Sequence, residues 1–250
     1  DGNIVDGDGA EALENHLPWE AGEYAVTIAV SFVGNSNYET QEYSATLDVD
    51  AKEIAVTWSA TENVSENGGV YEVVYDFEPH TLNASVNNAP VRNGKDSGEG
   101  ITLDVALADG ASLPSRVLGD EEAYTLYVVG INGEGAHNFK FGNDMQTYSS
   151  SARLKILRRT VGVVGVPVDD YIYGDSLPIT KWTSADKRFE TAAAAHIGAR
   201  IEDASGAEIA DRFTPAGTNC FVVPYKKNPA DEFFNDFVVN IDKTATLTVN

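Results

Sequence analysis

One six-residue pattern occurs three times in the chain, and it constrains the fold more than any other feature. The copies are Ser44–Val49, Ser151–Ile156 and Thr244–Val249, and in each one Ala, Leu and Val or Ile occupy alternate positions. Such alternation predicts a β-strand with one buried face. Successive copies start 107 and 93 residues apart, which is about the length of one small β domain. The chain is therefore predicted to consist of similar β modules.

The spacing of the copies sets the expected domain boundaries. We expect a partial N-terminal β module in residues 1–50, which supplies only the closing half of a module, and complete modules in residues 51–157 and 158–250. Because the third copy stops one residue before the end, we also expect the sequence to be a piece of a longer array. Ala51–Glu53 is interpreted as a short linker or as a strand that continues from one module into the next.

Strand and turn patterns fill most of the chain. The most regular strand is predicted for Tyr24–Phe32, where every second residue is apolar, and it ends at the turn-forming cluster Gly34–Asn37. The best helix candidate is a short one at Glu190–Ala195, which Gly198 could end. In the second module, strands are expected at 54–58, 71–77, 82–86, 101–107, 124–131 and 138–141, with a long run at 152–164.

These patterns predict a mainly β protein made of tandem small Ig-like β-sandwich modules in an elongated array. About seven short strands and little helix in the second module favour the Ig-like sandwich. The Ala-rich segment of the third module, Ala192–Ala195, leaves β-grasp-like modules open as the alternative.

Composition and charge limit the partners that the chain can have. A formal net charge of −22 and a pI near 4.3 make nucleic acid and anionic membrane surfaces poor partners, because both would repel the chain. No window reaches the roughly 18 apolar residues that a membrane span needs, so no membrane insertion is expected. Cys220 is the only cysteine, which rules out an intrachain disulfide, and its apolar neighbours predict a buried, unreactive thiol.

No catalytic constellation stands out, and the chain is not expected to be an enzyme. The four histidines, His16, His80, His137 and His196, lie far apart and outside the sequence contexts of nucleophile–base pairs. The sequence has no cysteine or histidine spacing typical of zinc sites. A glycosidase pair cannot be chosen among 39 acidic residues, and short modules offer little room for a substrate cleft.

Calcium is the one cofactor that the acidic composition keeps open. Asp6 and Asp8 show the alternation of calcium loops, but Ala10 occupies the next ligand position, so a flexible acidic linker is preferred. Two further acidic groups, Asp120–Glu122 and Asp231–Glu232 with Asp236, flank expected strands. Calcium held at the module ends is the alternative for these groups, and solvated loop charge is the preferred interpretation. We therefore expect no cofactor, with calcium as the alternative.

Exposed aromatic side chains are the candidates for ligand binding, because their rings can stack on sugars. Trp58 closes an alternating strand and is expected in a core. Trp182 lies in a less regular segment, and Tyr173 lies in a Tyr-Gly turn. Trp182 and Tyr173 are therefore the candidate ligand-binding residues.

Three segments of the third module match a known pattern in order and spacing. Tyr173–Pro178 has Tyr-Gly followed by Asp, a small residue, one further residue and Pro, Glu190–Ala193 has an acid-Thr-Ala sequence, and Thr246–Val249 is a closing strand. In these features the module resembles the MBG-type repeats of bacterial cell-surface, adhesin-like proteins, in the variant marked by Tyr-Gly-x. The resemblance covers residues from about 161 to 250.

The resemblance extends less evenly to the other modules. Gly22–Tyr24 and Thr46–Val49 are similar to the end of such a repeat. The second module departs from the pattern, since Tyr75-Asp76 stands where Tyr-Gly is expected and the loops are longer. The second module is therefore interpreted as a related Ig-like unit of another subtype.

What the resemblance implies is a tandem array on an exported protein, at the bacterial cell surface. The first expectation is a non-catalytic structural or spacer segment, a stalk, of such a protein. The alternative is a glycan- or protein-binding adhesin module, and a fragment of a carbohydrate-active enzyme comes third. The expected partners are neighbouring modules of the same chain and, for the alternative, a host glycan or an extracellular protein.

Overall fold

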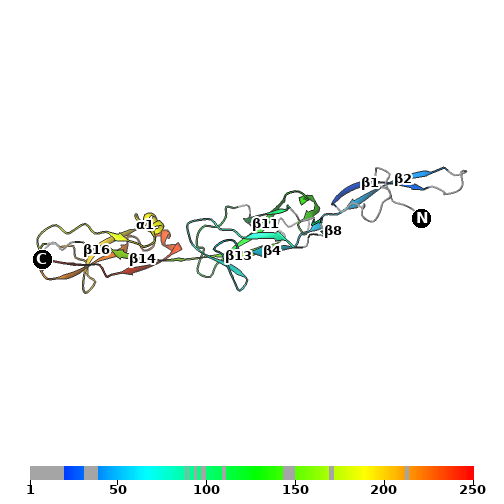
Figure 1. Cartoon of the computed structure of the whole chain (residues 1–250). Coiled ribbons are helices and arrows are strands. Elements are labelled where there is room, and N and C mark those ends of the chain that lie inside the picture. Colours follow the sequence, from blue (N-terminus) through cyan, green and yellow to red (C-terminus); the bar gives the residue numbers. More distant parts are fainter. Residues whose placement is uncertain are drawn as a thin grey trace. The chain divides into compact units, whose positions relative to one another are not determined.

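The chain folds into a mainly β structure, as predicted. The computed structural model describes residues 20–30, 39–87, 89, 91–92, 95–96, 100–108, 111–142, 150–168, 172–211 and 214–250. Strands make up 48% of the structure, and the described residues contain one α-helix (Figure 1). No helix in these ranges is long and apolar enough to cross a membrane.

The chain divides into two compact units. Unit 1 comprises residues 1–71, 80–114 and 124–154, and unit 2 comprises residues 72–79, 115–123 and 155–250. The backbone therefore passes between the units five times, after residues 71, 79, 114, 123 and 154. The two short segments of unit 2 that interrupt unit 1 are named the junction segments. Residues 1–50 fall within unit 1, so the division into three modules stays a prediction.

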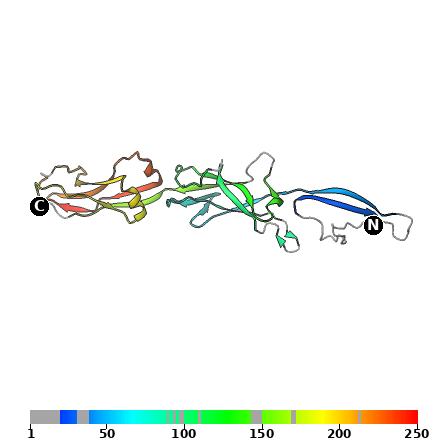
Figure 2. The ribbon, with the colours of Figure 1, turned by 90° about the horizontal axis from the view of Figure 1, so that it is seen from above.

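The first described element of unit 1 is a long hairpin. β1 (Gly22–Val30) pairs antiparallel with β2 (Gln41–Val49) along the full length of both strands, which are blue in Figure 2. The register places the alternating apolar residues of the two strands on one face. Large side chains on this face are exposed, among them Ile28 at 44%, Tyr43 at 58% and Leu47 at 39%. An isolated two-stranded hairpin is only marginally stable in water.

The remainder of unit 1 contains an interrupted opening strand, formed by β3 (Lys52–Glu53) and β4 (Val56–Ser59). β12 (Phe139–Lys140) pairs with β3 in parallel, and β7 (Asn83–Val86) pairs with β4 antiparallel. The 3-10 helix η2 (Ala136–Asn138) directly precedes β12. The opening strand is therefore flanked by one parallel and one antiparallel neighbour.

A five-stranded sheet accounts for most of the other strands that precede residue 158. Its order is β10-β11-β13-β6-β5, and β6 and β13 each run from unit 1 into unit 2. β8 (Val91–Arg92) and β9 (Lys95–Asp96) form a separate small hairpin. The strands of the sheet are β10 (Thr102–Leu107), β11 (Tyr124–Asn132), β13 (Ser151–Leu157), β6 (Val70–Val74) and β5 (Ser65–Asn67).

The tryptophan that the strand pattern assigns to a core, Trp58, is half-buried and packs against the core of unit 1. Ile54, Val128 and Phe139 form a buried cluster, and Trp58 packs against it. The indole Nε1 of Trp58 donates a hydrogen bond of 2.8 Å to Ser150 Oγ. A buried indole N–H needs such an acceptor, which fixes how the ring packs.

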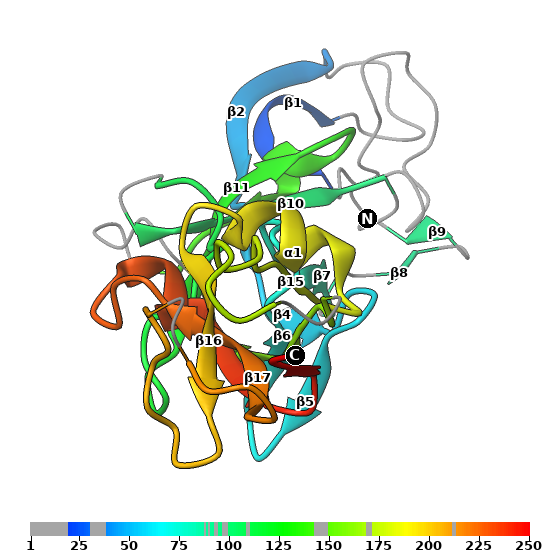
Figure 3. The same cartoon turned by 90° about the vertical axis from the view of Figure 1, so that its left-hand side faces the viewer.

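Unit 2 contains two three-stranded sheets. In the first, β14 (Arg159–Gly165) pairs antiparallel with β15 (Trp182–Thr183) and in parallel with β18 (Phe237–Asp242). In the second, β17 (Asn219–Lys226) lies between β16 (Ile197–Asp203) and β19 (Thr246–Thr248), and Figure 3 shows β16 beside β17. The 3-10 helix η3 (Glu232–Asp236) directly precedes β18.

The pairing plan of unit 2 repeats that of residues 51–157. The opening strands are β3–β4 and β14, and each has one antiparallel and one parallel neighbour. The parallel neighbours, β12 and β18, both begin with Phe and both follow a 3-10 helix. The closing strands β13 and β19 each pair with the preceding long strand, β11 or β17.

The three copies of the six-residue pattern differ in burial. Leu154 is fully buried and Leu247 is 2% exposed, whereas Leu47, at the same position of the first copy, is 39% exposed. Apolar residues at alternate positions thus face a core in the second and third copies. In the first copy the hairpin leaves them accessible.

The single α-helix in the described residues is α1 (Lys187–Ala193). It starts three residues before the predicted helix because the Asp186 side chain accepts from Phe189 N–H and caps it. Phe189 is fully buried, so the helix is anchored by packing as well as by alanine propensity. It ends before Gly198, which lies in β16.

Candidate functional site at the junction segments

The junction segments, Glu72–Pro79 and Ser115–Ala123, pack onto the C-terminal part of unit 2. They meet it at the end of η3 and at the first residue of β18. The side chains that carry this packing form the junction cluster, which consists of Tyr75, Phe77, Arg116, Asp236 and Phe237.

Aromatic rings form the apolar part of the junction cluster. The ring centroid of Phe237 lies 5.2 Å from that of Tyr75 and 5.7 Å from that of Phe77. It also lies 4.9 Å from Phe189 and 5.1 Å from Phe233. These distances fall in the range of about 4.5–7 Å in which aromatic rings attract. Burial raises the pKa of the Tyr75 phenol, so this side chain is neutral.

A buried carboxylate forms the polar part of the junction cluster. Asp236 is 2% exposed, and its Oδ2 pairs with Arg116 Nε. Its Oδ1 accepts a hydrogen bond of 2.8 Å from Val117 N–H, and Arg116 Nη2 donates to the carbonyl of Glu232 at 3.2 Å. Two neighbouring residues of one junction segment therefore satisfy both oxygens of this carboxylate.

Further polar contacts tie the other junction segment to the start of β14. Tyr75 N–H donates to the carbonyl of Leu157 at 2.9 Å, and Arg159 Nη1 donates to the carbonyl of Tyr75 at 3.5 Å. Arg159 Nε also pairs with Asp186 Oδ2 at 2.6 Å. Burial raises the pKa of Asp186, but hydrogen bonds from Phe189 N–H and Arg159 outweigh this effect and lower it. The carboxylate is therefore charged when it holds Arg159.

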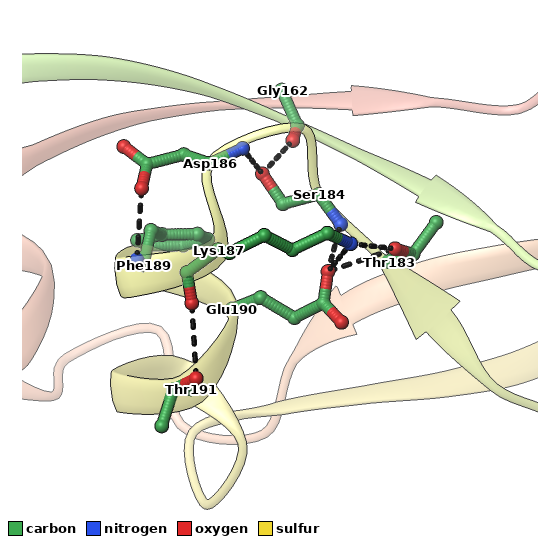
Figure 4. Close-up of polar contacts among 8 residues, drawn as sticks. All are labelled: Gly162, Thr183, Ser184, Asp186, Lys187, Phe189, Glu190 and Thr191. Carbon is green, nitrogen blue, oxygen red and sulfur yellow. Dashed lines mark hydrogen bonds and ion pairs between the residues drawn. The ribbon is translucent and has the colours of Figure 1, made fainter.

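A hydrogen-bond network links α1 to β14 and β15 (Figure 4). Ser184 Oγ donates to the carbonyl of Gly162 at 2.7 Å. Glu190 Oε2 accepts from Ser184 N–H, Thr183 Oγ1 and Lys187 Nζ at 2.7–2.8 Å. The hydrogen bond from Lys187, followed by those from Ser184 and Thr183, lowers the pKa of Glu190 to about 2. The network positions α1 and, through it, Phe189.

An open groove of about 890 Å³ lies beside the junction cluster, between Val74, residues 158–162 and residues 185–188. Four of its lining residues are basic, which is unusual in so acidic a chain. Each basic side chain lies within 3.1 Å of a carboxylate oxygen, in the pairs Arg158–Asp120, Arg159–Asp186, Lys187–Glu190 and Arg188–Glu78. These acids offset the positive charge of the groove.

A second buried carboxylate, Glu202, lies at 3% exposure in β16. Its Oε1 accepts from Arg200 Nε and Nη2 at 2.9 and 2.7 Å, and its Oε2 accepts from Lys243 Nζ at 3.0 Å. Burial raises the pKa of Glu202, but the hydrogen bonds from Lys243 and Arg200 outweigh it and lower the pKa. This arrangement holds a charged acid in place and gives it no free proton to transfer.

The histidine and the cysteine of unit 2 have structural contacts. His196 Nδ1 lies 2.6 Å from Asp231 Oδ2, and the His196 ring stacks on Phe233 at 4.3 Å. Among the described residues, no hydroxyl or thiol makes a hydrogen bond with the His196 ring. Cys220 is fully buried, as expected, and burial raises the pKa of its thiol. Neither group has the surroundings of a nucleophile.

The two candidate ligand-binding residues lie in different surroundings. Trp182 is half-buried in β15, donates from Nε1 to the carbonyl of Ile197 at 3.1 Å and packs 6.3 Å from Phe189. Tyr173 is 52% exposed. Within the described ranges no group of three His, Cys, Asp or Glu side chains is placed to hold a metal ion. The calcium candidates Asp6 and Asp8 lie outside those ranges.

Comparison with known proteins adds no relative. No protein-family model, no curated protein and no solved structure matches the chain. The interpretation of the site therefore depends on its geometry.

Sequence reasoning missed the junction cluster, and it treated Asp236 as solvated loop charge. That interpretation of Asp236 is wrong, because its carboxylate is buried against Arg116 and Val117. One signal was available in the segment Phe233–Phe237, where three Phe surround Asn235 and Asp236. An acid enclosed by aromatic residues favours a paired, buried carboxylate over a solvated one.

Proposed function

We propose that the chain is a non-catalytic spacer segment of a bacterial cell-surface protein, built from tandem Ig-like β-sandwich modules. The observation that carries this proposal is the fivefold passage of the backbone between the two units. A single flexible linker would let two domains reorient freely. Five covalent connections restrict bending far more, as a spacer requires.

The junction cluster supports the same proposal. Its rings and its buried carboxylate fix the junction segments to η3 and β18 with specific directional contacts. Loss of the Asp236 carboxylate is expected to cost about 3 kcal/mol, because Val117 N–H loses its acceptor while the half-exposed Arg116 can be hydrated. The junction segments are thus anchored within unit 2.

The repeated pairing plan supports a tandem architecture. Residues 51–157 and 158–250 both have an opening strand with one parallel and one antiparallel neighbour, and both have a closing strand with the six-residue pattern. Two similar β modules in one chain are the arrangement expected of an array. Asp186 and Glu202 of unit 2 are paired with Arg159 and Lys243, which supports a structural role for these acids.

Small-angle X-ray scattering of the purified chain tests the proposal. A compact globule of 250 residues has a radius of gyration of about 18 Å. A spacer should give a clearly larger value and a long maximum dimension. A radius of gyration near that of the globule would refute the spacer.

A second candidate function is an adhesin module that binds a glycan or a protein, and the exposed ring of Tyr173 favours it. Exposed tyrosine rings stack on sugars and anchor protein interfaces. A glycan-array signal that disappears in Tyr173→Ala, or in Trp182→Ala, would support this function. A chain that gives no signal on such arrays would leave the spacer as the better account.

A further inference from the structure

One kind of hydrogen bond, from a backbone N–H to the side chain of the last residue of a 3-10 helix, occurs twice in the chain. Asp236, the last residue of η3, accepts from the backbone N–H of Val117 at 2.8 Å. Asn138, the last residue of η2, accepts from the backbone N–H of Ala21 at 2.6 Å. Both acceptors directly precede the Phe that opens β12 or β18. Both donors lie in the segment that precedes a long strand, β11 or β1.

This recurrence defines a common corner for joining modules. The corner consists of a 3-10 helix that ends in Asn or Asp, followed by a Phe that is buried at 6% or 3%. In each case the donor belongs to the sequence module that precedes the corner. The same connection is therefore built between residues 1–50 and 51–157, and between residues 51–157 and 158–250.

A second pair of matching hydrogen bonds shows which part of the third module would contact such a corner. Tyr75 N–H donates to the carbonyl of Leu157 at 2.9 Å, and Tyr173 N–H donates to the carbonyl of Asn250 at 2.9 Å. Leu157 and Asn250 are the residues that directly follow the second and third copies of the six-residue pattern. Tyr75 and Tyr173 are therefore equivalent positions.

The two equivalent tyrosines differ in burial. Tyr75 is 8% exposed because its ring packs 5.2 Å from that of Phe237, in an edge-on arrangement. Tyr173 is 52% exposed. The residues that precede them are exposed in both cases, Val74 at 48% and Ile172 at 61%. The tyrosine is therefore the residue whose exposure differs between the two positions: it is buried at position 75, which residues 158–250 follow, and exposed at position 173.

We propose that the surface around Tyr173 and Asn250 is a docking face for a further module of the same kind, joined directly behind Asn250. This proposal rests on the proposed function. The occupant would carry the corner described above, with a Phe that packs on the Tyr173 ring as Phe237 packs on Tyr75. It would be connected as closely as β13 is to β14, which only Arg158 separates.

The experiment extends the full chain by a second copy of residues 158–250, attached to Asn250. Nitration of tyrosines by tetranitromethane, read by mass spectrometry, measures the accessibility of Tyr173 with and without the extension. We expect the modification of Tyr173 to fall several-fold in the extended chain. Tyr43, which is 58% exposed in the first hairpin, is the control and should react equally in both chains.

Variants of the extended chain test the packing. Tyr173→Ala should lower the thermal midpoint of the extended chain by at least about 4 °C and leave that of the unextended chain nearly unchanged. Tyr173→Phe should keep the midpoint of the extended chain, since the ring packs. Ile172→Ala is the matched control, because its equivalent Val74 stays exposed where a module follows.

Three results would overturn the proposal. In the first, Tyr173 stays reactive in the extended chain or the appended copy remains unfolded. In the second, the unextended chain dimerises and protects Tyr173, which would assign the face to a second copy. In the third, Tyr173 stays reactive and a glycan signal depends on it, which would assign the face to a ligand. Scattering of the unextended chain tests the spacer separately, so the two failures are distinguishable.

Discussion

Removal of the Asp236 carboxylate tests the junction cluster most sharply. Asp236→Ala leaves the Val117 N–H without its acceptor, which costs about 1–3 kcal/mol, and removes a charge-assisted hydrogen bond worth about 1.5–3 kcal/mol. The Arg116 side chain is 54% exposed and can be hydrated, so the second contribution falls at the lower end of its range. We expect unit 2 to lose about 3 kcal/mol of unfolding free energy.

Calorimetry of the chain measures this loss as a lower midpoint for the transition of unit 2. A loss of about 3 kcal/mol corresponds to more than about 10 °C for a unit of this size. Asp236→Asn keeps an acceptor for Val117 N–H and should cost only about 1 kcal/mol. Glu232→Gln is the control, because Glu232 is an exposed acid in the same 3-10 helix. If Asp236→Ala and Glu232→Gln shift the midpoint equally, the carboxylate does not anchor the junction segments.

The remaining predictions concern unit 2 and the repeated pattern. Gly165→Ala should destabilise unit 2 by about 3 kcal/mol, because the new Cβ would overlap a backbone carbonyl of β17. Gly162→Ala in the same strand is the control and should be nearly neutral. Urea unfolding measures the stability of both variants. Leu247→Ala should cost about 2–5 kcal/mol, and Leu47→Ala, at the equivalent exposed position, less than about 1 kcal/mol; similar costs would contradict the difference in burial. The lowered pKa of Glu202 contributes stability that is present above the ordinary pKa of 4.5 and is lost as the pH falls toward the folded-state pKa. The unfolding free energy of unit 2 should therefore fall below about pH 4.5. Glu202→Gln should flatten this dependence of stability on pH.

Local features of the fold could be predicted from the sequence. The first copy of the six-residue pattern lies within β2, the second lies within β13, and the third contains β19, because alternation specifies a strand whatever surrounds it. The burial of Cys220 also follows from its apolar neighbours. The boundaries of α1 were predicted less well, because the side-chain cap at Asp186 starts the helix before the run of alanines on which the prediction depended.

Non-local features could not be predicted. Alternation says that one face is apolar but not that a partner covers it, so the exposure of Leu47 could not be distinguished from the burial of Leu154. The pairing of Asp236 with Arg116 joins residues 120 positions apart, and no local pattern encodes it. The same limit applies to the junction segments, which lie within the sequence of the second module and pack in unit 2.

The distance between the two units, measured by double electron–electron resonance, tests the central claim most directly. Spin labels at Ser85→Cys in unit 1 and Asn240→Cys in unit 2 occupy exposed positions, and the native Cys220 is fully buried and stays unlabelled. A spacer held by five chain connections should give one narrow distance distribution, which Asp236→Ala should broaden. A broad distribution in the unmodified chain would contradict the spacer, because it would mean that the units reorient freely.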